Sequence, residues 1–157
     1  MVAIGRKVWD SIGLAGRRMP VALQQYIHVT DDKTEALEAA ERARFVGRMV
    51  HALRQPEVSL DGTFLNAGPL PDEPPLETFR DNLIIGDPHL VAERMAEEIR
   101  RLDPIHYNCF FQFGDMPVRR ALRAMERFGT EVIPLLERAV GPLGAIGASA
   151  DVAVAVT

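Results

Sequence analysis

The chain has a single cysteine, Cys109, among its 157 residues, so it cannot form an internal disulfide bond. That composition is typical of a reducing compartment, and we expect a cytoplasmic protein. No apolar run approaches the ~18 residues that suggest a membrane-spanning helix, and the first residues lack the apolar core of a signal peptide. The sequence therefore predicts a protein without a membrane partner.

Strong charge of either sign is also missing. The formal net charge is −4, which argues against nucleic acid or an anionic membrane as the main partner. Hydrophobic residues make up 47% of the chain and charged residues 25%, as in ordinary globular proteins. A single domain of this length can bury roughly 70% of its unfolded surface, which is enough for a real core.

Several familiar chemical motifs are absent. The chain has no HExxH, CxxC, P-loop, GxSxG or GxGxxG sequence. Its four histidines are His28, His51, His89 and His106, and none of them pairs with another at the spacing of metal ligands. We therefore expect no metal site, and the residues by themselves assign no catalytic group.

The second half of the chain alternates short apolar runs with helical patterns. Leu83-Ile-Ile is a short strand, Asp87 can cap the helix that follows, and Pro88 suits its first turn. The run 105–113 is a second, nearly continuous hydrophobic strand, as expected when both faces are covered. This order predicts an α/β protein with a parallel sheet or barrel, in which ligands bind at the carboxyl ends of the strands.

The first half repeats the order. Residues 21–30 form a strand rich in β-branched and aromatic residues, and a helix follows over 33–54. Asp32 is a suitable N-cap, and Glu35 three residues later completes a capping-box pattern. One apolar stripe of this helix is expected to pack on the sheet: Ala36, Ala40, Ala43, Val46, Val50 and Leu53.

The strand 105–113 has two different faces, because alternate side chains point to opposite sides. The apolar face, expected to pack under helices, carries Ile105, Tyr107, Cys109, Phe111 and Phe113. The more polar face, expected to point into a barrel, carries His106, Asn108, Phe110 and Gln112.

Three residues near the carboxyl ends of the strands are candidates for a binding site. Gln112 can hydrogen-bond a ligand or simply hold the next loop. Phe110 can contact an aromatic cofactor or belong to the core, and His28 can border a site or be a hydrogen-bonded residue of the interior. Cys109 falls on the helix-packed face and is expected to be an inert buried thiol.

Two segments lack a clear periodic pattern. Residues 55–82 hold five of the eleven prolines and are predicted to form an irregular surface loop within one domain, although a linker between two units is the alternative. Residues 139–157 end in small, almost uncharged residues and are expected to form a poorly structured tail, with an edge strand as the alternative.

An ordered set of short sequences resembles the C-terminal end of luciferase-like flavin-dependent monooxygenases. The similarity covers about residues 20–138 and includes the strand and helix that start at Val21. Its clearest stretches are Leu83-Ile-Ile-Gly-Asp-Pro88, Val91-Ala-Glu-Arg94, Phe111-Gln-Phe-Gly114, Met116-Pro117 and Arg127-Phe-Gly-Thr-Glu-Val-Ile-Pro134.

The resemblance implies a partial (β/α)8 TIM barrel that contains only its C-terminal strands and helices, within residues 1–138. It implies FMN or a deazaflavin at the carboxyl ends of the strands, a small organic substrate that is oxygenated with reduced flavin and O₂, and a homo-oligomer. Gln112, Phe110 and His28 would border the flavin.

Members of that family are about twice as long, and the front of the barrel has no counterpart here. The usual catalytic residues and much of the phosphate site belong to those strands, so we expect the chain alone to bind FMN weakly or not at all. Two alternatives remain: a non-catalytic α/β module that oligomerises through an exposed sheet face, and a small flavodoxin-like domain, which would lack its phosphate loop.

Overall fold

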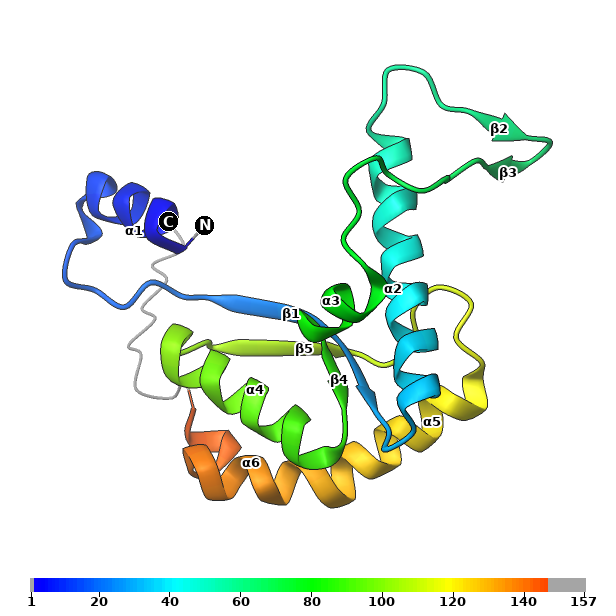
Figure 1. The fold of residues 1–157 in the computed structure, drawn as a ribbon. Coiled ribbons are helices and arrows are strands. Elements are labelled where there is room, and N and C mark those ends of the chain that lie inside the picture. Colours follow the sequence, from blue (N-terminus) through cyan, green and yellow to red (C-terminus); the bar gives the residue numbers. More distant parts are fainter. Residues whose placement is uncertain (1, 147–157) are drawn as a thin grey trace.

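The computed structural model describes residues 2–146 and contains a three-stranded, fully parallel sheet (Figure 1). Its strands are β1 (Ala22–Val29), β4 (Ile84–Gly86) and β5 (His106–Phe110), in the order β4-β1-β5. The strands pair in register, with Ile27 opposite Ile84 and Tyr26 opposite Phe110. The expectation of a mixed α/β fold with a parallel sheet is confirmed.

The order of the strands differs from that of a barrel. Consecutive strands of a (β/α)8 barrel are neighbours, whereas here β1 separates β4 from β5, and the described residues close no barrel. An order in which the first strand lies between the next two, with helices on both faces, is the start of a doubly wound sheet. The connections β1–β4 and β4–β5 run in opposite directions along the sheet, and their helices pack on opposite faces, as expected if both crossovers have the usual right hand.

The two crossover helices begin at the predicted caps. The carboxylate of Asp32 accepts hydrogen bonds from the backbone N–H groups of Thr34 and Glu35 at the start of α2 (Lys33–Leu53). Asp87 does the same at the start of α4 (Pro88–Leu102). The remaining helices and helical turns are α1 (Val2–Trp9), a π-helical segment (Asp10–Leu14), α3 (Leu76–Asp81), α5 (Val118–Arg127), a second π-helical segment (Phe128–Val132), α6 (Ile133–Val140) and a 3₁₀ turn (Leu143–Ala145).

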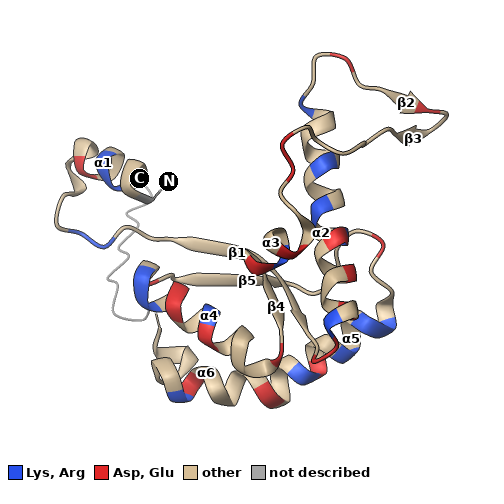
Figure 2. Cartoon of the chain, viewed as in Figure 1, with Lys and Arg blue, Asp and Glu red and all other residues tan. Residues whose placement is uncertain are grey.

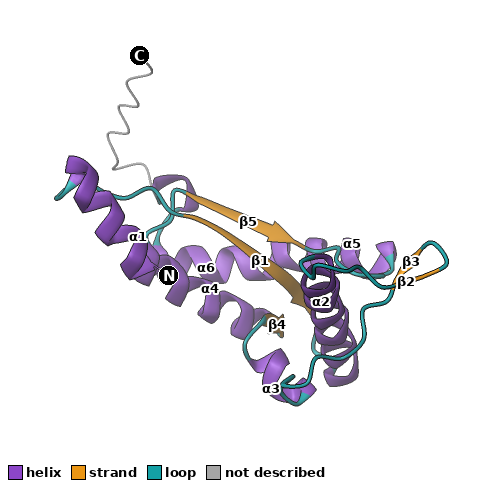
Figure 3. Cartoon of the chain, turned by 90° about the horizontal axis from the view of Figure 1, so that it is seen from above, coloured by secondary structure: helices purple, strands orange, loops and turns teal. Residues whose placement is uncertain are grey.

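One face of the sheet packs against α4 and α6. Ile27, Val29 and Ile84 point to this side, where they meet the apolar stripe of α4. As predicted, the apolar face of β5 lies here as well. Tyr107 and Cys109 of β5 and Phe111 just after it lie on this side. Ile105, expected on the same face, precedes the strand and is 43% exposed. Figure 3 shows both helices beneath the long strands.

The other face is covered by α2 only near the carboxyl ends of the strands. Four buried alanines of α2 pack on Tyr26, Ile85 and Phe113: Ala36, Ala39, Ala40 and Ala43. Phe113 was expected to share a face with Tyr107, but β5 ends at Phe110 and the alternation of faces ends with it. The amino-terminal half of this face remains exposed at Ala22, Gln24, His106 and Asn108.

The distal half of α2 corrects the predicted packing of its stripe. Val50 and Leu53 are exposed, because this half projects away from the sheet as an arm (Figure 1). The segment 55–82, expected to be irregular, continues the arm with a hairpin of β2 (Leu60–Asp61) and β3 (Phe64–Leu65) and then forms α3. Pro75, which suggested loop, is the residue that precedes α3.

Residues 118–140 form one long helix with a wider turn at Phe128–Val132. Pro134 has no N–H for the carbonyl four residues earlier, which explains why the helix forms this wider turn just before it. The helix continues to Val140, past the expected start of the tail at residue 139, and Leu143 and Ile146 pack against the core. Residues 147–157, the rest of the predicted tail, lie outside the described residues.

A search of the helices within residues 2–146 for one with the length and apolar character of a membrane span found none.

Candidate functional site

The carboxyl ends of β1 and β5 meet the first turns of α2 and the helix α5. The chain leaves β5 through a tight turn at Gly114, whose φ is 58°. A Cβ atom at this position would lie 3.1 Å from the carbonyl oxygen of Arg42, so glycine lets the turn pack directly on α2. This close approach brings α5 beside the beginning of α2.

Glu35, in the first turn of α2, is the centre of a polar cluster at this edge. One carboxylate oxygen, Oε1, lies 3.1 Å from His28 Nε2, and the other, Oε2, accepts a hydrogen bond of 3.1 Å from the Thr30 hydroxyl. The Arg123 guanidinium donates to both oxygens at 2.8 and 2.9 Å. The cluster thus links β1, α2 and α5.

Burial and charge set the protonation of the two titratable partners. Burial lowers the pKa of His28 and outweighs the opposing effect of its contact with Glu35. Burial alone would raise the pKa of Glu35, but hydrogen bonds from Arg123, His28 and Thr30 lower it below its usual value. At neutral pH the pair is therefore a neutral imidazole and a carboxylate.

The carboxylate fixes the tautomer of His28. Because an ionised carboxylate can only accept, the imidazole proton must be on Nε2, and Nδ1 is then an acceptor. His28 is fully buried, and its Nδ1 atom has no hydrogen-bond partner among the described residues. The arrangement provides one fixed, completely buried acceptor beside the sheet.

The structure brings two of the three predicted site residues together. Tyr26 lies on the same face of β1 as His28, and its ring meets that of Phe110 edge to face at 6.2 Å. The ring of Phe113 is closer to Tyr26, at 4.8 Å. Gln112, two residues after the end of β5, is exposed and its side chain makes no hydrogen bond with any residue in 2–146.

Three residues of the cluster were missed from the sequence: Thr30, Glu35 and Arg123. Glu35 was explained by a capping box, but its carboxylate faces His28 and Arg123, and the N–H of Asp32 donates to the Thr30 hydroxyl instead. Arg123 is 88 residues away in the chain. The sequence did contain one indication of the contact between Glu35 and His28. Glu35 lies in the first turn of the helix that follows the strand containing His28.

A hollow of about 320 Å³ opens at the same edge, between the first turns of α2 and α4. Its lining includes Asp31, Lys33 and Arg80. The side chains of Asp32 and Asp87 already accept the N–H groups at both helix starts. Those donors are therefore not free for a phosphate group, which helix N-termini otherwise bind.

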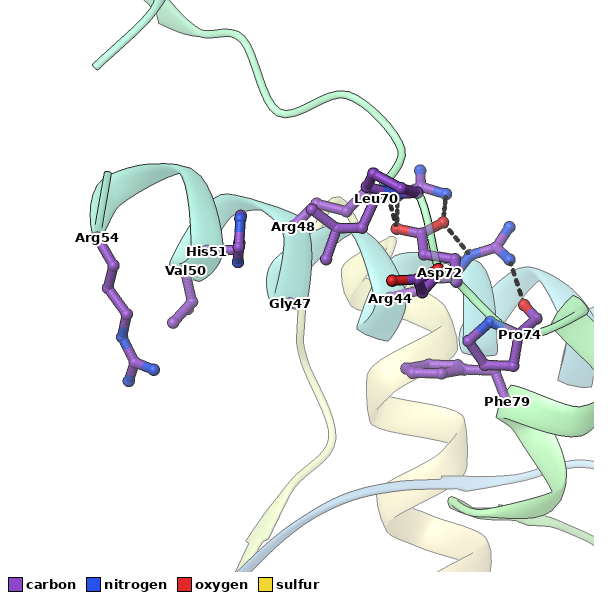
Figure 4. Close-up of a pocket in the computed structure, with 12 residues that line it drawn as sticks. Arg44, Gly47, Arg48, Val50, His51, Arg54, Leu70, Asp72, Pro74 and Phe79 are labelled. Atoms are coloured by element: carbon purple, nitrogen blue, oxygen red, sulfur yellow. Dashed lines mark hydrogen bonds and ion pairs between the residues drawn. The ribbon is translucent and has the colours of Figure 1, made fainter. Parts of the chain in front are cut away.

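A larger hollow of about 520 Å³ lies on the arm, between the distal half of α2 and the segment 70–74 (Figure 4). Arg48 holds the carboxylate of Glu73 through two hydrogen bonds of 2.6 and 2.5 Å, and the N–H of Leu70 donates to the same carboxylate. Hydrogen bonds from Arg48 lower the pKa of Glu73 to about 2. These contacts attach the segment to the helix and leave Arg54 at the outer end (Figure 4).

The remaining sequence expectations concern thiol and metal chemistry. Burial raises the pKa of the half-buried Cys109 to about 11, so its side chain is a thiol at neutral pH and a poor nucleophile. Within residues 2–146, no three His, Cys, Asp or Glu side chains gather where a metal ion could be held.

Comparison with known proteins finds a curated relative that is itself uncharacterized. The chain is 33% identical over 132 residues to the uncharacterized protein y4vJ of Sinorhizobium fredii (strain NBRC 101917 / NGR234). The match covers 83% of this chain and 38% of y4vJ, so the chain spans well under half of that relative. No family model and no solved structure matches the chain.

Proposed function

We propose that the chain is the C-terminal portion of a luciferase-like flavin-dependent monooxygenase of the cytoplasm, which oxygenates a small organic substrate. The observation that carries the proposal is the parallel β–α–β arrangement that collects Tyr26, His28 and Phe110 on one face near the carboxyl ends of β1 and β5. This is the edge at which α/β barrels bind their ligands. The ordered sequence motifs and the greater length of y4vJ support the same conclusion.

The described residues fit one side of a flavin better than the whole cofactor. The partly exposed aromatic ring of Phe110 suits an isoalloxazine ring. The unpartnered Nδ1 of His28 suits an N–H or O–H donor, but His28 is completely buried, so a ligand reaches it only if α2 moves away from this face. A phosphate cradle is missing from the neighbouring helix starts, because Asp32 and Asp87 occupy them. A bound flavin would carry the redox chemistry, and these residues would contact and orient it.

A closed barrel requires a different strand order and a different position of α2. In a closed barrel β4 would lie between β1 and β5, and α2 would lie outside the barrel, whereas α2 here covers part of the face that should point inward. The partial barrel therefore requires that β5 and α2 move when the remaining strands are supplied. Three strands alone leave two open edges, and an open sheet that lacks partners can change its pairing.

Flavin titration with and without the missing part tests the proposal. The chain alone is expected to quench FMN fluorescence weakly and without saturation. The chain mixed with a fragment of y4vJ that lacks the matching region is expected to bind FMN stoichiometrically. Stoichiometric binding by the chain alone, or no binding by a mixture that forms a stable complex, would contradict the proposal.

A second candidate function is a non-catalytic module that oligomerises through its sheet. The specific observation in its favour is the uncovered amino-terminal half of one face, which exposes Ala22, Gln24, His106 and Asn108. The β4-β1-β5 order also suits a small self-contained sheet better than part of a barrel. Light scattering after size exclusion distinguishes the two: a uniform flavin-free oligomer that Asn108→Lys dissociates favours the module.

A further inference from the structure

The arm ends in an apolar hairpin with nothing of its own chain against it. Phe64 is 77% exposed and Leu60 is 61% exposed, and Val58 beside them is also uncovered. Figure 1 shows the hairpin at the far end of the arm, away from the sheet and from α4, α5 and α6. A hairpin of two-residue strands is marginal by itself, so burial of these side chains would add to its stability.

A second exposed apolar surface lies on α5. Val118, Leu122 and Met125 occur at steps of four and three, so they form one stripe along the helix, and Leu122 is 58% exposed. The other side of α5 packs its small residues Ala121 and Ala124 into the protein. The uncovered stripe is therefore a surface of the molecule that remains available for a partner.

The charges beside the two surfaces are opposite. The hairpin segment 55–66 contains two acidic residues, Glu57 and Asp61, and neither lysine nor arginine. Helix α5 is mostly basic (Figure 2) and contains four arginines and one glutamate. Its Arg119 makes no ion pair within residues 2–146. Glu57 and Asp61 are likewise without ion partners in this part of the chain.

We propose that the hairpin tip of one copy docks on α5 of a second copy, and that the contact is repeated reciprocally in a two-fold dimer. The tip supplies Leu60 and Phe64 as apolar anchors, and Asp61 faces the partner's Arg119. Each copy carries both surfaces, so two identical contacts close the assembly. The charge pair selects the orientation of the contact, and the apolar side chains provide most of its free energy.

Sedimentation velocity of the full chain over a concentration series tests this proposal. The chain is expected to dimerise, and Phe64→Ser is expected to raise the dimer Kd by about 10-fold or more, because a buried aromatic side chain is lost. Ile12→Ser, at another exposed apolar position in the π-helical segment after α1, is the matched control and should leave the Kd unchanged. Far-UV circular dichroism and the Tm should be unchanged in both variants.

Charge exchange gives the sharper result. Arg119→Glu should weaken the dimer by repulsion from Asp61, and the added change Asp61→Arg should restore it. A monomer at all concentrations, an assembly that grows beyond two copies, a dimer insensitive to Phe64→Ser, or a failure of Asp61→Arg to rescue would each overturn the proposal.

Discussion

Helix α2 carries two ion-pair clusters that differ in what they attach. The cluster near its first turn joins Glu35 to a strand and to α5 and includes a fully buried histidine. The cluster on its distal half joins Arg48 to Glu73 and holds only a surface segment. The same kinds of charge therefore serve the core at one end of the helix and a loop at the other.

Packing differs in the same way along the helix. The proximal half buries four alanines, which allows a close approach to the sheet, whereas the distal half leaves Val50 and Leu53 exposed. A stripe of small residues followed by larger ones does not by itself show where the contact with the sheet ends. Only the first half of α2 therefore belongs to the framework of the site.

Overfilling the proximal contact should give the largest loss of stability. Ala40 is completely buried, so Ala40→Leu is expected to lower the free energy of unfolding by about 3 kcal/mol. The matched change Val50→Leu on the exposed half should alter it by less than ~0.5 kcal/mol. Urea unfolding measures both, and equal effects would remove the contrast between the two halves.

Breaking the proximal cluster should cost less than overfilling the core. Glu35→Ala leaves His28 Nε2 without its acceptor and is expected to cost about 2 kcal/mol. Glu38→Ala, which removes a more exposed carboxylate that pairs with Arg120, is the control and should hardly move the unfolding midpoint. A similar loss for both variants would show that burial does not distinguish Glu35.

Breaking the distal cluster should act locally. Glu73→Gln is expected to cost about 1 kcal/mol and to speed proteolytic cleavage near residues 70–74 without changing cleavage elsewhere. Because the folded pKa of Glu73 is lowered to about 2, its contribution is present above the usual value of 4.5 and is lost as the pH falls toward 2. Global unfolding on Glu73→Gln would contradict the assignment of this cluster to a loop.

The smallest effect should be the pH dependence that comes from His28. Its folded pKa lies below 6.5, so the unfolded chain takes up the proton first and stability should fall as the pH drops through 6.5. His28→Gln keeps an N–H for Glu35 but cannot titrate, so this part of the dependence should disappear. Urea midpoints at pH 7.5 and 5.5 measure it, and an unchanged dependence in the variant would contradict the buried, neutral histidine.

Local chemistry made much of the fold predictable. Asp32 and Asp87 begin their helices as expected, and the strands at 22–29 and 106–110 lie within the predicted runs, because caps and hydrophobic periodicity act over a few residues. The wider helical turn before Pro134 is likewise a local effect, because proline has no N–H to donate.

Features that depend on contacts between distant residues could not be predicted from local sequence patterns. The order β4-β1-β5 depends on which strands pair, and an apolar strand pattern is the same for any neighbour. The contact between Glu35 and Arg123 joins positions 88 residues apart, and the local capping explanation of Glu35 was sufficient but incomplete. Of the three predicted site residues, His28 and Phe110 lie on the same face of the sheet, and Gln112 comes two residues after the end of β5.

Cross-linking of β1 to β5 tests most directly the claim that these strands are parallel neighbours whose carboxyl ends meet at one site. Gln24 and Asn108 are register partners with exposed side chains, so the double variant Gln24→Cys, Asn108→Cys in a Cys109→Ser background places two thiols side by side. A short bis-maleimide should join them within one chain in high yield, while each single-cysteine variant gives no such product. If the double variant stays folded and forms no intramolecular cross-link, β1 and β5 are not neighbours and the site described here does not exist.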